Sequence, residues 1–233
     1  MPRPVSILFF VPHPVFNQFE VEEFAGFDKP RSSFMYRNLL LNQLEVVHQW
    51  GRHQKCILLL HQFDIGAEGL DELQRFEEAE VVFYEEGNQG HILDEIGEEA
   101  LHEQELLIIV NPAVMGLTAN DYDDLLNFTD QEDEVAFIAR SSNGWVSSVS
   151  FNYNETAQKN VICGIGDPWV KVLRSVSMLE ARPLITTSGL VVRGKKDFRS
   201  LYDFLSSKES IPACSFEMHD RFTELFVEYK ELL

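Results

Sequence analysis

The sequence is poor in cysteine, in basic residues and in long apolar runs. Its three cysteines, Cys56, Cys163 and Cys214, lie far apart and form no CxxC pair. Neither a disulfide framework nor a zinc site is therefore expected. No apolar stretch approaches the roughly 20 residues that cross a bilayer, and the run at residues 5–11 is too short for a signal peptide. These absences predict a cytoplasmic protein with no membrane partner.

Basic residues are outnumbered two to one. The chain has 19 Lys and Arg against 38 Asp and Glu, a formal net charge of −19. Such a charge repels a phosphate backbone, so a nucleic-acid partner is not expected. The imbalance is confined to residues 1–138, which hold 7 basic and 27 acidic residues, whereas residues 139–233 hold 12 and 11. A small anionic ligand would have to be held mainly by the second part.

Apolar runs typical of strands alternate with segments of helical periodicity along most of the 233 residues. This alternation predicts one α/β domain over residues 1–233, a three-layer α/β/α sandwich with a mainly parallel, mixed sheet, and an added helical segment at 206–233. Strands are expected at residues 6–11, 56–60, 81–84, 106–110, 135–139 and 190–192. Helices are expected from about residue 33 to Gly51 and at residues 70–76, 89–101, 121–128, 169–179, 196–205 and 222–233.

Local signals add detail to this pattern. Ser32 or Ser33 is predicted to cap the first long helix, and Asp167-Pro168 to start the helix at 169–179. Asn143-Gly144 predicts a tight turn between two strands.

The strand Leu106–Val110 is followed by a turn that contains Pro112 and Gly116. In open α/β sheets, ligands bind beyond the carboxyl ends of the strands, so residues 111–118 are expected to border a pocket. This stretch offers no carboxylate, no basic group and no nucleophile beyond the Thr118 hydroxyl. No catalytic residue is therefore assigned.

Five segments, in the same order, resemble small bacterial glycosyltransferase-like proteins of the GT-A, or nucleotide-diphospho-sugar transferase, fold. They are a helix reading MYRNLLLNQL, the segment QGHIL, the strand end with Gly116-Leu117-Thr118, the turn at 138–150 with Gly144 and Trp145, and the segment 165–171 with Trp169. The resemblance implies a GT-A fold and a nucleotide sugar as the ligand class.

The chain departs from this family where the family binds a metal and a diphosphate. The aspartates that hold a divalent metal in the family correspond to Ala113, Ser142, Val191 and Arg193, and its basic phosphate loop corresponds to VFNQFEVEEF. The acidic residues of that loop would repel a diphosphate. The resemblance therefore implies a protein without metal or cofactor that has lost metal-dependent transfer and acts as a binding or regulatory module. The alternative is a metal-independent nucleotidyl- or glycosyltransferase.

Candidate ligand-binding residues come from their place near the ends of predicted strands and from the family resemblance. His13 follows the first strand and has a suitable acid/base range, and Arg140 ends a strand, where a guanidinium can replace a metal as charge stabiliser. For each candidate the alternative is a hydrogen-bonded or solvated residue without a binding role. The candidates are His13, Lys29, Arg31, Asn111, Arg140, Asn143 and Trp169.

Two apolar features allow alternatives. Phe16, Phe19, Phe24 and Phe27 crowd the first loop and are predicted to fill the former nucleotide cleft, or else to form a small core under the loop. The aromatic face of the last helix either covers the sheet or forms a homodimer with a second copy.

Overall fold

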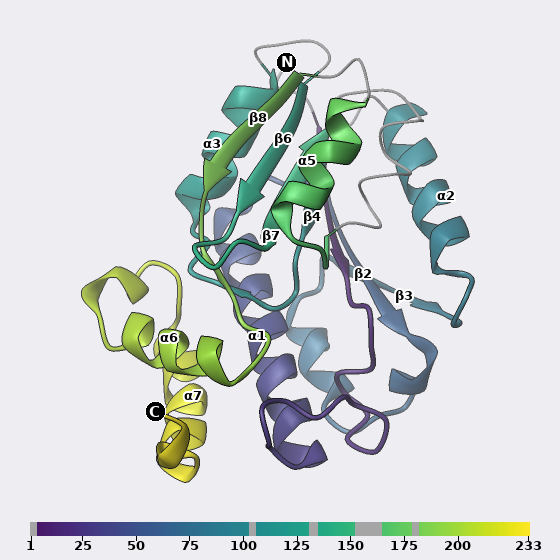
Figure 1. Cartoon of the computed structure of the whole chain (residues 1–233). Helices are drawn as coiled ribbons and strands as arrows, with labels where there is room; N and C mark the ends of the chain where they lie inside the picture. Colours follow the sequence, from purple (N-terminus) through teal and green to yellow (C-terminus); the bar gives the residue numbers. More distant parts are fainter. Residues whose placement is uncertain (1–3, 103–105, 131–134, 152–164, 179–181) are drawn as a thin grey trace.

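The computed structural model describes residues 4–102, 106–130, 135–151, 165–178 and 182–233. In this part of the chain a seven-stranded sheet has the order β3-β2-β1-β4-β7-β6-β8 (Figure 1). β7 pairs antiparallel with both of its neighbours, and the other pairings are parallel. The strands are β1 (Val5–Phe10), β2 (Lys55–His61), β3 (Ala79–Tyr84), β4 (Leu106–Val110), β6 (Val135–Arg140), β7 (Val146–Phe151) and β8 (Arg182–Thr187).

Helices cover both faces of this sheet. α1 (Lys29–Trp50) and α3 (Ala119–Asp130) pack on one face, where their buried residues share a core with alternate residues of β1 and β4. α2 (Gln89–His102) and α5 (Trp169–Ser177) cover the other face (Figure 1). The predicted three-layer α/β/α sandwich with a mainly parallel sheet is confirmed.

The C-terminal part lies beside α1 rather than over the sheet. A ribbon of β5 (Val114–Met115) and β9 (Leu190–Val191) leads into α6 (Lys195–Leu205), and α7 (Phe216–Glu228) packs against α1 (Figure 1). Phe222 and Leu225, on the aromatic face of α7, are fully buried within the chain. These two residues are therefore not available to a second copy, and a homodimer through other residues of the C-terminal helix stays a prediction. Short 3-10 helices are η1 (Gln62–Asp64), η2 (Leu70–Arg75), η3 (Lys208–Ser210) and η4 (Lys230–Leu232).

The start of α1 differs from the prediction. Asp28 is the N-cap, and its carboxylate accepts a hydrogen bond from the backbone N–H three residues later, at 2.8 Å. The Ser32 hydroxyl instead accepts from the N–H of Phe24 at 2.8 Å, and the Ser33 hydroxyl donates to the carbonyl of Val15 at 2.6 Å. Both serines are thus used to hold the loop that precedes the helix.

Most other elements follow the sequence pattern, but β5 was not expected and α7 begins at Phe216, six residues before its predicted start. β6 and β7 form the predicted hairpin around Gly144, whose φ of 87° needs the left-handed conformation that glycine adopts easily. The segment predicted as a helix at 70–76 is 3-10, β8 was not expected, and Pro168 rather than Asp167 is the N-cap of α5. The predicted end of the α5 helix, at Leu179, lies outside the described residues. Among the described residues, no helix has the length and apolar character needed to cross a membrane.

Tyr122 of α3 provides a test of the core. Its side chain is fully buried, and its hydroxyl has no hydrogen-bond partner among the described residues. A buried hydroxyl without a partner is destabilising. Tyr122→Phe is therefore expected to raise the free energy of unfolding by roughly 1 kcal/mol in urea titrations.

Tyr84→Phe is the matched control for this prediction. The Tyr84 hydroxyl donates to the carbonyl of Val11 at 2.8 Å, so its removal is expected to lower stability by roughly 1 kcal/mol. Equal losses in the two variants would contradict the assignment of an unpaired hydroxyl at Tyr122.

Candidate functional site

An open pocket of about 140 Å³ lies where β1 and β4 end. This is the edge at which the sequence placed it. Its walls come from the loop after β1, from Tyr36 of α1, from the turn after β4, from Gly166 before α5, and from the segment after β9. The lining residues are Val11, Pro12, His13, Val15, Glu22, Tyr36, Asn111, Pro112, Ala113, Gly166, Val191, Val192 and Arg193.

The loop after β1 is held in place by a buried carboxylate. Asp64 is fully buried and accepts hydrogen bonds from the backbone N–H groups of Val15 at 3.1 Å, Phe16 at 2.8 Å and Asn17 at 2.9 Å. Burial raises the pKa of Asp64, while these N–H groups act to lower it. A polar interaction from η1 thus fixes the wall that carries His13.

The phenylalanines of this loop pack beside the pocket. Phe24 and Phe27 are buried against Phe198 of α6, with ring centroids 6.2 and 5.2 Å away, and Phe27 stacks on Tyr229 at 3.9 Å. Phe19 is 74% exposed. Because the pocket remains open, the prediction that the rings fill it is wrong. The alternative, a small core under the loop, describes Phe24 and Phe27.

Asn111 shapes the second wall, where β4 ends. Its side-chain amide donates to the carbonyls of Val146 at 3.0 Å and Ile165 at 3.1 Å, and its oxygen accepts from the N–H of Ala113 at 3.0 Å. Both amide donors are therefore used by the backbone. Asn111 lines the pocket, and its main contribution is to fix the turn after β4 against β7.

Arg193 supplies a positioned cation on the third wall. Its guanidinium lies 3.9 Å from the ring centroid of Trp145 and donates to the carbonyl of Gly166 at 2.7 Å. Its backbone N–H donates to the carboxylate of Asp197 at 3.1 Å, which also accepts from Asn143 at 2.9 Å. These contacts fix the guanidinium of Arg193 at one end and its backbone at the other.

Sequence reasoning did not select Arg193 as a binding residue. It treated the position only as one that had lost an aspartate. The available signal was the cationic run Arg193-Gly194-Lys195-Lys196 in an acidic chain. The described residues place no carboxylate within ion-pair distance of Arg193, whereas Arg31, Arg37 and Arg221 all form ion pairs.

His13 and Tyr36 form the face between these walls. Their ring centroids are 4.7 Å apart in an edge-to-face arrangement, and the Nδ1 of His13 lies 3.2 Å from the carbonyl oxygen of Pro14. Burial, followed by the nearby Glu22 carboxylate, raises the pKa of Tyr36 to about 12, against an opposing effect of Arg193. Tyr36 therefore contributes a neutral side chain to the pocket lining at physiological pH.

Lys29 and Arg31 do not line this pocket. The ammonium of Lys29 donates to the carbonyl of Phe19 at 2.6 Å, and Arg31 pairs with Glu228 of α7 at 2.7 Å. The structure thus places both cations at the start of α1, where they tie the loop and the C-terminal helix together.

Arg140, Asn143 and Trp169 gather around the turn between β6 and β7, next to the pocket. The guanidinium of Arg140 lies 5.1 Å from the ring centroid of Trp169 and donates from Nε to the Thr187 hydroxyl at 2.9 Å. The amide of Asn143 donates to the carbonyl of Val191 at 2.7 Å. Asn143 thus supports the third wall, and none of the three residues lines the pocket.

Ala113, Val191 and Arg193, which correspond to metal-binding positions of the family, all line this one pocket. Among the residues that line it, Glu22 carries the sole carboxylate. No group of three or more His, Cys, Asp or Glu residues in the described part of the chain is arranged to hold a metal ion. A divalent metal prefers several oxygen ligands, so this donor set does not fit one.

The solved structures that resemble this one include the following three. A candidate nucleotide-diphospho-sugar transferase from Desulfovibrio desulfuricans G20 has a TM-score of 0.70 at 15% identity, over 99% of this chain and 98% of that one. The 4-diphosphocytidyl-2C-methyl-D-erythritol synthase from Anaerococcus prevotii DSM 20548 has a TM-score of 0.53 at 10% identity, over 96% of each chain. A cytidylyltransferase from Leptospira borgpetersenii has a TM-score of 0.52 at 8% identity, over 100% of this chain and 96% of that one.

No protein-family model and no curated protein sequence matches the chain. At these identities the structural similarity establishes the fold and leaves the activity open. The fold that the sequence resemblance implied is confirmed: the chain has the nucleotide-diphospho-sugar transferase-like fold.

Proposed function

We propose that the chain is a binding or regulatory module that takes a small anionic ligand into this pocket without a divalent metal. The observation that carries the proposal is Arg193, a guanidinium fixed by Trp145 and Gly166 at the pocket wall. A planar guanidinium binds phosphate and carboxylate groups through two parallel hydrogen bonds. Because no described carboxylate neutralises it, Arg193 is free to balance the charge of a ligand.

The size of the pocket bears on the ligand class. A volume of 140 Å³ has room for roughly ten water-sized groups. A sugar phosphate is of this scale, whereas a nucleotide sugar would extend from the pocket into solvent. Both share a phosphate that Arg193 can bind, so the proposal covers both.

Thermal-shift titration tests this proposal. Pyrophosphate, sugar phosphates, nucleotides and nucleotide sugars are titrated with and without Mn²⁺. A ligand at about a hundredfold over its dissociation constant contributes roughly 2.7 kcal/mol, or a shift of roughly 5–10 °C. At least one phosphate ligand is expected to stabilise the protein, and Mn²⁺ is expected not to increase this stabilisation. Arg193→Gln is expected to lower the affinity for that ligand at least tenfold.

Lys195→Gln is the matched control. It removes the same charge two residues away from a side chain that does not line the pocket, so affinity is expected to stay within about twofold. Equal binding by Arg193→Gln and the wild type would refute the role of Arg193. Metal-enhanced stabilisation by any nucleotide would refute binding without a metal.

A metal-independent nucleotidyl- or glycosyltransferase is the second candidate, favoured by the position of His13. Its ring lines the pocket with Nδ1 near a backbone carbonyl, which leaves Nε2 as the nitrogen able to accept a proton from a substrate. Release of pyrophosphate or of a nucleoside diphosphate in the presence of a chelator, abolished in His13→Gln, would establish this activity in place of a binding role.

A further inference from the structure

Two opposite charges line the pocket and stay apart. Glu22 extends from the loop after β1, and Arg193 comes from the segment after β9. The ion pairs of the described residues do not join Glu22 and Arg193 to each other, nor either of them to a third residue. Among the described residues, this leaves one charge of each sign without an ion pair in the same cavity.

Contacts on both walls restrain the segments that carry these two charges. Arg193 is held against Trp145 and Gly166 on its own wall. The loop that carries Glu22 is tied to α1, because Phe24 donates to the Ser32 hydroxyl. Because both side chains line one pocket and form no ion pair, a ligand in that pocket can contact both, and opposite charges attract over several ångströms.

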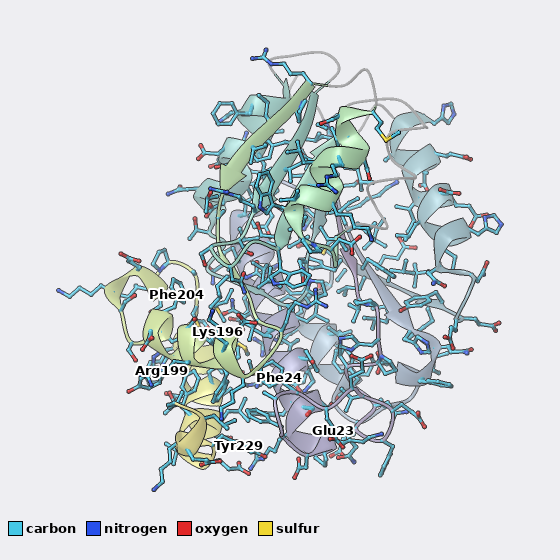
Figure 2. The ribbon with its side chains drawn as sticks, viewed as in Figure 1. Glu23, Phe24, Lys196, Arg199, Phe204 and Tyr229 are labelled. Atoms are coloured by element: carbon cyan, nitrogen blue, oxygen red, sulfur yellow. The ribbon has the colours of Figure 1, made fainter. Side chains whose placement is uncertain are left out.

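Residues near Glu22 and Arg193 in the sequence carry the same charges as these two. Glu20 and Glu23 lie in the same loop as Glu22, and Lys195 and Lys196 follow Arg193 at the start of α6. Figure 2 labels Glu23 beside Phe24 on the loop, and Lys196 and Arg199 on α6. These four neighbouring residues do not line the pocket, so Glu22 and Arg193 remain the two charges to which a bound ligand is assigned.

We propose that the pocket selects small zwitterions, with the anionic group of the ligand at Arg193 and an ammonium group at Glu22. This inference rests on the proposed function, since it adds a second charge to the same ligand. Amino-sugar phosphates have this chemistry and a size that suits the pocket. A ligand with only negative charge meets Arg193 favourably and is repelled by Glu22.

A matched pair of probes tests the proposal. Glucosamine 6-phosphate and glucose 6-phosphate differ by an ammonium group in place of a hydroxyl. Calorimetric titration at about pH 6.5 keeps that amine mostly protonated. The wild type is expected to bind glucosamine 6-phosphate about tenfold more tightly than glucose 6-phosphate.

Variants assign the preference to its residue. Glu22→Gln is expected to abolish the tenfold preference by weakening glucosamine 6-phosphate and sparing or improving glucose 6-phosphate. Arg193→Gln is expected to weaken both. Glu23→Gln changes the same charge on the same loop at a residue outside the lining, and it is expected to keep the preference. Glu22 and Glu23 are exposed and form no described ion pair, so unchanged melting temperatures without ligand are expected for these two variants. Arg193→Gln also loses the contacts with Trp145 and Gly166, so its melting temperature without ligand is expected to fall by a few degrees.

The outcomes separate the two proposals. Equal affinity of the wild type for both probes, with a loss in Arg193→Gln, would overturn the zwitterion proposal and leave anion binding at Arg193 intact. A preference that survives in Glu22→Gln would also overturn it. The absence of binding by either probe would reject both the zwitterion proposal and its sugar-phosphate ligand class, and the nucleotide titrations above would then decide on anion binding alone.

Discussion

Replacing Asp64 with alanine is expected to lower the free energy of unfolding by roughly 3–5 kcal/mol. The carboxylate accepts from three consecutive backbone N–H groups, of Val15, Phe16 and Asn17, and the first two residues are buried. A buried donor left without a partner costs about 1–3 kcal/mol, and no water reaches these two easily. Urea unfolding followed by circular dichroism measures the loss.

Two further variants locate the cause. Asp64→Asn keeps one oxygen that can accept from the three N–H groups, so it is expected to lose only about 1–2 kcal/mol. Asp71→Ala removes an exposed carboxylate of η2 and is expected to change stability by less than about 0.5 kcal/mol. If Asp64→Ala cost no more than Asp71→Ala, the loop after β1 would be held by other contacts. Since this loop carries His13 and Glu22, Asp64→Ala is also expected to weaken ligand binding.

The layers of the fold could be predicted because their signals are local. β4 has the boundaries that its five apolar residues predicted, and Gly51 ends α1 with a φ of 62° as expected. β8 escaped notice because Arg182–Thr187 is an edge strand, paired only with β6 among the described strands and mostly exposed, so it lacks the alternation of a half-buried strand. Hydrophobic periodicity arises from the burial of one face of an element, and an exposed edge strand buries too little of either face to show it.

The site was less predictable because its polar groups are positioned by contacts distant in sequence. Arg193 depends on Trp145, which lies 48 residues earlier, and the loop after β1 depends on Asp64. Asn111 and Asn143 were selected for their place in the resemblance, and both prove to be bonded to backbone carbonyls. The sequence could place the pocket at the end of β4. It could not show which charges would remain unpaired around it.

Replacing Gly189 with alanine is expected to lower the free energy of unfolding by roughly 2–5 kcal/mol. Gly189 has a φ of 75°, and a Cβ there would lie 2.8 Å from a methyl carbon of Val114 and 2.9 Å from the carbonyl oxygen of Met115. The left-handed conformation strains alanine by about 1–2 kcal/mol, and the overlap with the backbone of β5 adds about 1–3 kcal/mol. Urea unfolding measures the sum.

Gly66→Ala separates the two contributions. Gly66 also has a positive φ, of 70°, but no atom lies within 4 Å of the position of its Cβ. It is expected to lose only the conformational part, about 1–2 kcal/mol. An equal loss at both positions would show that β5 and β9 move apart to admit the methyl group. Such a movement would displace the wall that ends in Arg193, so Gly189→Ala would then weaken phosphate binding, while Gly66→Ala, at a residue that does not line the pocket, would not.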